Sequence, residues 1–318
     1  MDKVSLFMNH LPFQLISFHG WGVFPLIILF MGMIALASVS QNRYRFRSAL
    51  VCLLLGNFFI WTHNLDSPPL IVTFLDVGQG DACVIEDGKR TILVDAGYAG
   101  FGKDYGNRVV LPYLKHKGID KIDLMVMTHP HADHIGGLET VLKNITIREI
   151  WDTYNDFESY VYDRILKGAE HNKSTIRYPQ PGDIFQLGEM KLTILYPDSA
   201  VSISMKNINN ASIVFRLDYA GQKFLFTGDA EIQAERILAN LDTLLHVDVI
   251  KAGHHGSNTS SIMSMVNHVS PKYAVISVGK NNRYGHPSEK IVQRWVDIRT
   301  EVFRSDESGA VIIAVDGE

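Results

Sequence analysis

Cysteine is scarce in this sequence. Only two cysteines occur, Cys52 and Cys83, and both lie in apolar runs. Their spacing matches neither a disulfide framework nor a cysteine-based metal site. We therefore interpret both as buried thiols, which leave the redox compartment of the protein open.

An excess of positive charge is also missing. The chain has 30 Lys and Arg against 34 Asp and Glu, a formal net charge of −4. No global basic field therefore marks a nucleic-acid-binding surface, although a local basic groove is compatible with this charge. The glycine-rich segment 100–106 lacks the Gly-Lys-Ser/Thr ending of a phosphate-binding P-loop. We predict no nucleotide site there.

Apolar residues are concentrated near the N-terminus. Residues 16–38 contain no Asp, Glu, Lys or Arg and are long enough to cross a bilayer. A second, shorter apolar run covers residues 49–61. We predict a membrane segment over residues 1–66 that contains a transmembrane hairpin, with helices at about 16–38 and 48–62. A signal peptide is the competing interpretation, and the late start of the apolar region and the second run disfavour it.

Three arginines, Arg43, Arg45 and Arg47, lie between the two apolar runs. The positive-inside rule places this loop in the cytoplasm, so both ends of the hairpin would lie outside. This predicts a protein of the cytoplasmic membrane whose C-terminal domain is on the extracytoplasmic side. If the second segment only lies on the membrane surface, the orientation does not hold.

The sequence Asn-Leu-Asp-Ser-Pro-Pro at residues 64–69 is rich in residues that break helices and strands. We therefore predict a second domain over residues 67–318. Its pattern begins with short strands separated by turns and continues with strands that alternate with helices, which predicts two sheets covered by helices. The predicted helices are 109–117, 138–143, 160–170, 231–241, 261–267 and 289–299.

Histidine is dense in one stretch of this domain. Residues 128–137 read Thr-His-Pro-His-Ala-Asp-His-Ile-Gly-Gly. A short apolar run at 121–127, of the kind that forms a buried strand, comes before them, and the predicted helix at 138–143 follows. The stretch therefore lies on a strand-to-helix turn, where side chains can converge on one point.

The spacing within this turn favours metal binding. His129 and His131 are two residues apart in an extended segment and project to the same side, whereas Asp133 and His134 lie past the bend and can face a second position. Imidazole and carboxylate are ligands that zinc and manganese prefer. We predict a site for one or two Zn²⁺ or Mn²⁺ ions. The alternative is a solvated turn that happens to be rich in histidine, and polar residues at later strand ends disfavour it.

Further polar residues follow other predicted strands. Asp95 stands beside a small-residue loop, where simple turn chemistry explains it equally well. Asp229 lies in a tight Thr-Gly-Asp turn that, taken alone, would be an ordinary turn. His254 and His255 end a buried strand, and because paired histidines are a costly choice for packing, they favour ligation or catalysis. His286 precedes a proline, and a lone histidine of this kind is more often structural.

Taken together, these residues resemble the metallo-β-lactamase superfamily. The residues that carry the resemblance are Asp95, the motif His129-x-His131-x-Asp133-His134, Asp229 in Thr-Gly-Asp, and a histidine at a late strand end. The resemblance implies an α/β fold, a metallo-β-lactamase-like four-layer αβ/βα sandwich with the metals at one edge between the sheets.

A narrower resemblance is to the C-terminal domain of the ComEC competence proteins, which are membrane channels for DNA uptake. It rests on Phe-Leu-Asp-Val-Gly-Gln-Gly-Asp at residues 74–81, the turn His254-His255-Gly256-Ser257, and Tyr284-Gly285-His286-Pro287. It covers about residues 70–318, and the predicted hairpin fits as the last membrane segments of such a protein. A full family member also has an N-terminal soluble domain and a larger channel bundle, so we expect a fragment, a split gene product or a shorter relative.

The resemblance also implies roles for residues. His129, His131, Asp133, His134 and His255 would hold metal, and Asp229 would bridge two ions. His254 would contact the substrate phosphate, and the order of the two adjacent histidines stays open. Asp95 and Ser257 would support the ligand loops. The superfamily usually supplies another metal histidine before the strand of the bridging aspartate, but residues 207–212 contain none, so Asn210 or water would take that place.

The function implied is a metal-dependent phosphodiesterase, most concretely a nuclease that acts on DNA during uptake. Asp133 would hold or deprotonate the attacking water, and His254 and His286 would stabilise the charge that develops on the phosphate. The expected partners are DNA, the membrane and other components of a DNA-uptake channel. Near the mouth of the site, Lys280, Arg283 and Lys290 would contact the DNA backbone or, equally, form an ordinary solvated surface.

Two alternatives remain open at this point. One is a non-cleaving DNA-transport component with a degenerate, structural metal site, which the missing histidine motivates and Asp229 argues against. The other is a hydrolase of another phosphoester or of a thioester, because this fold serves many substrates.

Overall fold

The computed structural model describes residues 69–153, 157, 159–200, 206–241 and 245–316, with short helical pieces at 31–32, 51 and 54–56. Backbone contacts divide the chain into two units, Met1–Ser67 and Pro68–Glu318. The predicted membrane helices at 16–38 and 48–62 lie almost wholly outside the described residues. Among the described residues, no helix has the length and apolar character needed to span a bilayer.

The second unit is built on two seven-stranded sheets. The first sheet has the strand order β16-β1-β2-β3-β6-β7-β8. Its pairs are antiparallel from β16 to β3 and parallel from β3 to β8. The strands are β1 (Leu70–Phe74), β2 (Cys83–Glu86), β3 (Thr91–Val94), β6 (Lys121–Val126), β7 (Thr146–Trp151), β8 (Thr175–Arg177) and β16 (Val311–Val315).

The second sheet repeats this mixed plan in the order β15-β14-β13-β12-β11-β10-β9. Its pairs are antiparallel from β9 to β12 and parallel from β12 to β15. The strands are β9 (Ile184–Leu187), β10 (Met190–Tyr196), β11 (Val214–Tyr219), β12 (Gln222–Phe226), β13 (Val249–Lys251), β14 (Tyr273–Ile276) and β15 (Glu301–Arg304). A small hairpin, β4 (Ala99–Gly100) and β5 (Lys103–Asp104), projects beside the first sheet.

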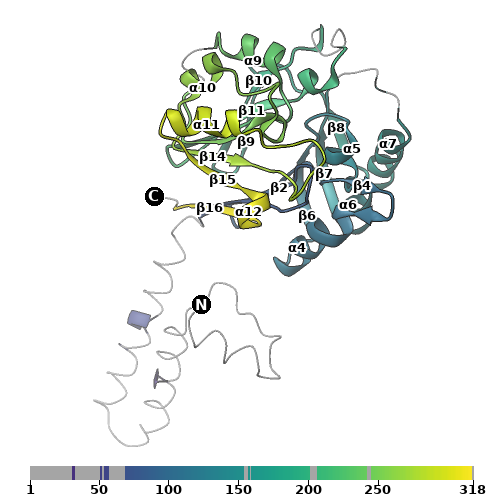
Figure 1. Ribbon diagram of the computed structural model, residues 1–318. Coiled ribbons are helices and arrows are strands. Elements are labelled where there is room, and N and C mark those ends of the chain that lie inside the picture. The colour runs from purple at the N-terminus through teal and green to yellow at the C-terminus, as the bar shows by residue number, and fades with distance from the viewer. Residues whose placement is uncertain are drawn as a thin grey trace, which may run out of the picture. The chain divides into compact units, whose positions relative to one another are not determined.

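Helices cover the outer face of each sheet (Figure 1). On the first sheet lie α4 (Leu111–His116), which continues the π-helix η1 (Gly106–Val110), together with α6 (Leu138–Asn144) and α7 (Tyr160–Asn172). On the second lie α9 (Ile232–Leu238), α10 (Met263–Val269) and α11 (Glu289–Asp297). Shorter turns are α5 (Ala132–Ile135), η2 (Ile208–Ala211), η4 (Gly253–Gly256) and α12 (Ser305–Ser308).

The core follows from the alternation of apolar side chains along the strands. Leu70, Val72 and Phe74 of β1 all point between the sheets, as the two-residue period of a strand requires. There Phe74 stacks on Phe226 of the second sheet, with ring centroids 6.0 Å apart. The outer faces of the sheets pack on the helices in two further clusters. The layers are therefore helix, sheet, sheet and helix, and the predicted four-layer sandwich is confirmed.

Some elements differ from the sequence prediction. The edge strands β8 and β9 were not predicted, because neither is a clearly apolar run and both stay partly exposed. The predicted helix at 109–117 begins earlier, as η1, where Gly106 packs against Gly137 so closely that a Cβ atom would lie 2.1 Å from the carbonyl oxygen of Gly137. The start of this helix therefore depends on a tertiary contact that no local pattern contains.

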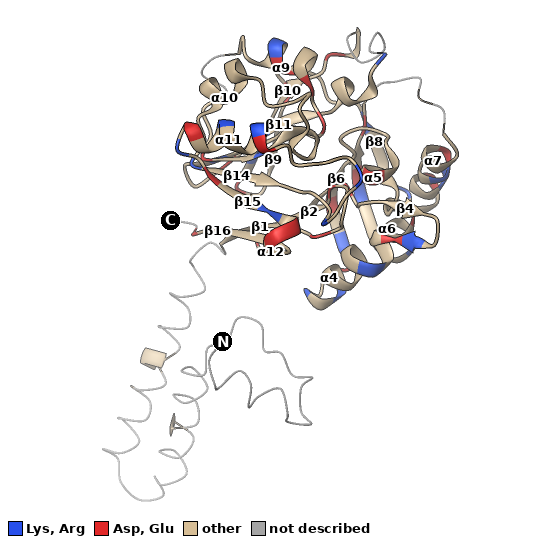
Figure 2. Cartoon of the chain, in the orientation of Figure 1, with Lys and Arg blue, Asp and Glu red and all other residues tan. Residues whose placement is uncertain are grey.

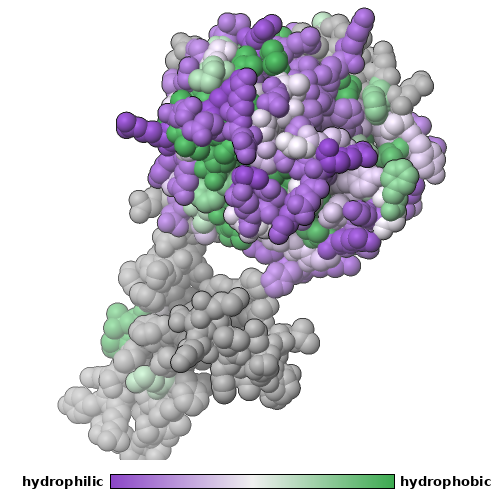
Figure 3. Space-filling view, viewed as in Figure 1, coloured by the Kyte–Doolittle hydropathy of each residue, from purple (hydrophilic) through white to green (hydrophobic). Residues whose placement is uncertain are grey.

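Charges of both signs are mixed over the outer helices, and Figure 2 shows no face of one sign in that view. Apolar residues reach the surface in separated patches (Figure 3). Both observations agree with the near-balanced count of acidic and basic residues. Any nucleic-acid contact therefore has to be sought locally, close to a site, rather than over a whole face.

Candidate metal centre

The predicted ligands gather where three strands end. The histidine-rich turn follows β6 of the first sheet, while Asp229 follows β12 and the His254–His255 turn follows β13 of the second. Strands β12 and β13 are parallel neighbours, so their carboxyl ends meet at one edge. Ligand sites in α/β sheets commonly form at this edge. The candidate centre therefore lies between the two sheets and takes residues from both.

Asp95 fixes the turn after β6. Its carboxylate accepts hydrogen bonds from the Thr128 backbone N–H (2.9 Å) and the Thr128 hydroxyl (2.7 Å). It also accepts one from His134 Nδ1 at 2.8 Å. Because Asp95 holds Nδ1 of His134, the other ring nitrogen, Nε2, faces Asp229 Oδ2 at 3.2 Å and would bind a cation once its proton is released. A histidine held by a carboxylate in this way is the usual arrangement of a metal ligand.

His129 and His131 face the same point. The Nε2 atom of His129 lies 3.1 Å from Nδ1 of His131, so two ring nitrogens converge, as their two-residue spacing predicts. His129 is fully buried, whereas His131 is partly exposed. His131 is absent from the groups of side chains whose ligand atoms lie within 4.8 Å of one another. It therefore stands at the outer edge of the cluster.

Asp229 stands at the centre of the cluster. Its Oδ2 atom lies 3.2 Å from His134 Nε2, 3.5 Å from His255 Nε2 and 3.9 Å from His129 Nε2. The turn that presents it is held by the Asp229 N–H, which donates to the Ser212 hydroxyl at 3.1 Å. With His254 Nε2 at 3.8 Å, one carboxylate oxygen thus faces four imidazoles from two turns, the position expected of a bridging ligand.

The two adjacent histidines differ in environment. His255 is buried, and its Nδ1 donates to the Ser277 carbonyl at 2.9 Å, which leaves Nε2 facing Asp133 at 3.6 Å. His254 is partly exposed, and its Nδ1 lies 2.8 Å from Glu231 Oε1. Both residues have positive φ angles, 46° and 53°. Such left-handed backbone at non-glycine residues is costly and concentrates at functional sites.

Several buried atoms in this cluster have no hydrogen-bond partner in the described part of the chain. They include His134 Nε2, His255 Nε2 and Asp229 Oδ1. Buried polar atoms are nearly always satisfied in folded proteins, so such a group needs a specific explanation. The side chains fall into overlapping groups of three with ligand atoms within 4.8 Å, among them His129–His134–Asp229 and Asp133–His134–His255. Their donor set, imidazole and carboxylate, fits a borderline metal ion.

The pKa values of the clustered side chains are shifted by their contacts with one another. Burial alone would raise the pKa of Asp229, but His134 and His255 hold that pKa well below its usual value. Burial would lower the pKa of His255, but Asp229 and Asp81 raise it to about 10. The pKa of His134 is likewise raised well above its usual value, by Asp229 and Asp95 against the effect of burial. Protons on these histidines balance the buried carboxylates, a balance that a cation can take over by releasing them.

The side chain of Asn210 is engaged at the start of a helix. Its Oδ1 accepts the backbone N–H groups of Glu231 and Ala234, both at 3.1 Å, at the start of α9. The free N–H groups of a helix start need such an acceptor. The amide oxygen is therefore already committed to this helix, and its position gives no support to a metal-ligand role.

Ser257 and His286 lie at the margin of the centre. The Ser257 hydroxyl lies 3.0 Å from that of Thr259, which in turn lies 3.2 Å from His254 Nδ1. The Ser257 side chain therefore reaches the His254 ring through Thr259, while its backbone N–H donates directly to the His254 carbonyl at 2.8 Å. His286 is partly buried, and its ring centroid lies 5.6 Å from that of His254. The geometry brings it beside His254, outside the ring of ligand atoms.

Two charged residues of the centre were missed in the sequence. Asp81 and Lys251 are both about 5% exposed and form a buried ion pair. Lys251 Nζ also donates to the Gly228 carbonyl at 3.1 Å and lies 3.8 Å from Asp229 Oδ1. A lysine at the end of an otherwise apolar strand was the available signal for Lys251. For Asp81 it was the glycine directly before it, Gly80. In the structure, a Cβ atom at Gly80 would lie 2.3 Å from the Asp133 carbonyl oxygen.

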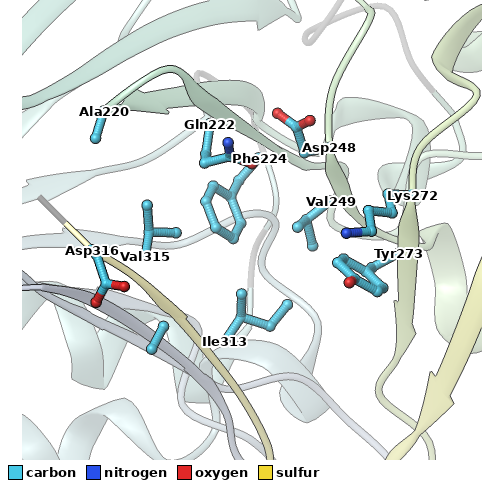
Figure 4. A pocket seen from close by; sticks show the side chains of 11 residues that line it. Ala220, Gln222, Phe224, Asp248, Val249, Lys272, Tyr273, Ile313, Val315 and Asp316 are labelled. Carbon is cyan, nitrogen blue, oxygen red and sulfur yellow. The ribbon is translucent and has the colours of Figure 1, made fainter. Parts of the chain in front are cut away.

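The domain has a second cavity, of about 460 Å³, at the other ends of the same strands. Figure 4 shows Phe224, Val249 and Tyr273 of the second sheet facing Ile313 and Val315 of β16 across it. Figure 4 shows no histidine among its lining side chains. This cavity therefore lacks the ligand chemistry found at the carboxyl ends of the strands.

The sequence matches the profile described as Metallo-beta-lactamase superfamily over residues 75–189 and 205–280. ComE operon protein 3 of Bacillus subtilis is 29% identical over 253 residues, which are 76% of this chain and 32% of that protein. Competence protein ComA of Neisseria gonorrhoeae is 31% identical over 241 residues, 76% of this chain and 31% of that protein. The chain thus spans about a third of the length of these relatives. The predicted relationship to competence proteins is confirmed over most of the chain.

Among solved structures, the metallo-beta-lactamase fold protein YhfI from Bacillus subtilis aligns with a TM-score of 0.50 and 13% identity. The alignment covers 77% of this chain and 99% of that chain. At this identity the similarity concerns the fold alone, and it agrees with the two-sheet sandwich described above.

Proposed function

The chain belongs to the metallo-β-lactamase superfamily, and from that premise we propose that it is a metal-dependent phosphodiesterase that cleaves DNA. The observation that carries this proposal is the convergence of four histidine nitrogens on one oxygen of Asp229, within 3.9 Å. The similarity to a competence protein supports DNA as the substrate.

The residues suggest how ions are held. Asp133, His134 and His255 would hold one position, and His129 with Asp229 the other, with His131 at its outer edge. We propose one or two Zn²⁺ or Mn²⁺ ions. When bound, such ions polarise a phosphate and lower the pKa of a water molecule to about 7.

Side chains of this chain supply the remaining chemistry. The Asp133 side chain is 33% exposed and is placed to orient the attacking water and accept its proton. The His254 side chain is 22% exposed, with Nδ1 held by Glu231. The Nδ1–H of His254 is thus used by Glu231, so its Nε2 would donate a hydrogen bond to a phosphate oxygen from the imidazolium form, in which both ring nitrogens carry a proton, as negative charge develops there. His286, whose ring stands next to that of His254, would extend this positive edge.

We propose further that the predicted hairpin at 16–38 and 48–62 anchors the domain to the cytoplasmic membrane, on its extracytoplasmic side. The relationship to competence proteins supports a membrane association. Other components of a DNA-uptake channel are the proposed partners.

One observation favours a second candidate function, a transport component that binds DNA without cutting it. Asn210 stands where the superfamily usually has a further histidine, and its oxygen is committed to α9. One ion position would then have few protein ligands, and the metal site would be structural.

The test is hydrolysis of labelled single- and double-stranded DNA by the detergent-solubilised full chain with Zn²⁺, Mn²⁺ or Mg²⁺, with metal analysis of the purified protein. We compare Asp229→Ala with Asp248→Ala, a carboxylate at the opposite end of β13 that accepts the Lys223 N–H at 2.8 Å. Loss of cutting only in Asp229→Ala, by more than about 100-fold, supports the proposal, because even residues that merely orient metal ligands contribute 10–100-fold.

Intact DNA from a folded, metal-loaded protein would contradict the nuclease proposal, and other phosphoesters and thioesters would then be tested. DNA binding without any bound metal would favour the transport component. Equal loss of cutting in both variants would show that the effect is one of folding.

A further inference from the structure

A cavity of about 570 Å³ opens next to the candidate metal centre. His131 and Asp133 line its inner side, so it is continuous with the proposed cleavage site. Its other walls come from distant parts of the sequence: Gln79, the β4–β5 hairpin and the loop after β14. A ligand that occupies this cavity would lie directly beside the reacting atoms.

Exposed aromatic rings line this cavity. Phe101, at the tip of the β4–β5 hairpin, is fully exposed, and Tyr284 is 55% exposed. Phe101 also has a φ of 48°, an unfavourable backbone angle for a bulky residue. A fully exposed phenylalanine ring and a half-exposed tyrosine ring in one cavity are a costly arrangement for a surface with no ligand, whereas exposed aromatic surface suits the planar face of a nucleobase.

Cations stand beside these rings. The Arg283 guanidinium lies 5.0 Å from the centroid of the Tyr284 ring and donates a hydrogen bond to its hydroxyl at 2.9 Å. Lys103 lines the same cavity. Within the described ranges, neither cation forms an ion pair with a carboxylate. Both charges are therefore available to the phosphates of a bound strand.

A line of rings connects this cavity to the centre. Tyr284 stacks on His286, with centroids 5.9 Å apart and planes at 18°. His286 stands against His254 at 5.6 Å, and His254 Nε2 lies 3.8 Å from Asp229 Oδ2. Each ring in the series Tyr284, His286 and His254 therefore lies next to the following one, and the last lies next to the proposed bridging carboxylate.

We propose that this cavity is a binding site for the unpaired bases of a single-stranded nucleic acid, which stack on Phe101 and Tyr284 while Arg283 and Lys103 contact the backbone. The position beside the cleaved phosphate rests on the proposed function, but the binding itself does not. Duplex DNA keeps its base faces stacked on one another and cannot use these rings. The cavity would therefore select single strands, with little dependence on base sequence.

The test measures binding without cleavage, in the presence of a chelator, with the full chain in detergent. The probes are a short oligothymidylate that carries one fluorescent adenine analogue, whose emission is quenched by stacking, and the matching blunt duplex. Phe101→Ala and Tyr284→Ala should each weaken single-strand binding about 10-fold and relieve the quenching. Phe101→Leu, which keeps the apolar bulk but removes the aromatic face, should behave like Phe101→Ala.

Arg283→Ala has a matched control in the second cavity. There Lys272 Nζ stands 4.8 Å from the centroid of the Tyr273 ring, so Lys272→Ala also removes an exposed cation from a tyrosine face. We expect Arg283→Ala to weaken single-strand binding and to reduce the slope of log affinity against log salt by about 0.7. Lys272→Ala should leave both unchanged.

Unchanged single-strand binding in Phe101→Ala and Tyr284→Ala, with unaltered quenching, would overturn this proposal. So would a Phe101→Ala variant that keeps oligonucleotide binding but loses association with vesicles of anionic lipid, because Phe101 would then be a membrane contact. Neither outcome touches the nuclease proposal, which depends on Asp229. Conversely, a chain that binds and quenches the probe but never cuts DNA would contradict only the nuclease proposal.

Discussion

Two cavities of this domain, one beside the candidate metal centre and one at the opposite ends of the strands, are alike in size and unlike in chemistry. One measures about 570 Å³ and the other about 460 Å³. Each contains a tyrosine with a cation near its ring, Tyr284 with Arg283 and Tyr273 with Lys272. Volume, aromatic content and surface charge therefore do not distinguish the two cavities. They differ in the buried polar atoms that lie next to them.

Behind the first cavity, buried ligand atoms such as His255 Nε2 and Asp229 Oδ1 have no hydrogen-bond partner in the described part of the chain. At the second, the carboxylate of Asp248 accepts the Lys223 backbone N–H at 2.8 Å and stabilises a turn. Unpartnered buried atoms also occur elsewhere in the described residues, at Thr193, Ser261 and Trp295, so a single one does not indicate a ligand. Several imidazole and carboxylate atoms left unpartnered together need a common explanation. The unsatisfied atoms, rather than the hollow, distinguish a functional site here.

The most severe way to test this contrast is to remove the buried cation. Lys251→Met removes the ammonium partner of the buried Asp81 carboxylate and leaves it only the His134 and His255 rings, at 3.6 and 3.5 Å. Breaking a buried ion pair typically costs about 3–5 kcal/mol of folding free energy. Lys272→Met, at the second cavity, removes an exposed cation and should change stability by less than about 0.5 kcal/mol. Urea unfolding of both variants measures the difference.

A second variant identifies the cause. Combining Lys251→Met with Asp81→Asn removes both charges, so part of the lost stability should return. If Lys251→Met alone were as stable as Lys272→Met, the ion pair would contribute nothing to the fold, and the two ends of the strands would be energetically equivalent.

The pH dependence of stability provides a second test, because it compares Glu235, a buried carboxylate outside the metal centre, with Asp229 inside it. Glu235 accepts the backbone N–H groups of Ser261 and Ile262, and burial raises its pKa from 4.5 to about 7. Between these pH values the folded state holds a proton that the unfolded state has released. Stability from this group is therefore complete below pH 4.5 and falls as pH rises to about 7, by at most about 3 kcal/mol.

Urea unfolding of the wild type and Glu235→Gln across this range checks the sign. The wild type should be the more stable at the acidic end, and its advantage should shrink as the pH rises. Parallel curves would show that Glu235 has the same protonation in both states. Asp229, whose pKa is lowered by His134 and His255 against the effect of burial, should have the opposite dependence.

The smallest expected effect concerns metal affinity. Asp95→Asn preserves the shape of the side chain but weakens the acceptor for His134 Nδ1. We expect metal affinity to fall about 10–100-fold, the usual effect of changing a residue that orients a ligand. Competition with a chelating fluorophore measures it. Asp248→Asn should leave the affinity unchanged, and a similar loss in both variants would remove the distinction between the two ends.

The layered fold could be predicted because its signals are local. The apolar runs that became β6 and β10, and the amphipathic stretch that became α7, contain their own periodicity. The edge strands β8 and β9 could not be predicted, because an edge strand is stabilised by a neighbour and need not be apolar on both faces. The π-helical start at Gly106 depends on the backbone of Gly137, far away in the sequence.

The candidate site divides in the same way. The turn with His129 and His134 could be found because its residues are adjacent in the sequence, and Asp229 because it ends a strand. The pairing of Asp81 with Lys251 could not, because it joins two sheets through segments far apart in the chain. The partner of the Asn210 side-chain oxygen could not be predicted from the neighbouring sequence either. That oxygen accepts N–H groups at the start of α9, and the position of α9 depends on the tertiary fold.

The ligands come from both sheets, and this has a mechanical consequence. His134 is attached to the first αβ half through β6, whereas Asp229 and His255 belong to the second through β12 and β13. A cation bound by all three would link the two halves, so its binding free energy would add to the stability of the folded domain. The melting temperature of the domain should therefore rise with the concentration of free metal ion. The proposed activity and the stability would then both depend on that concentration.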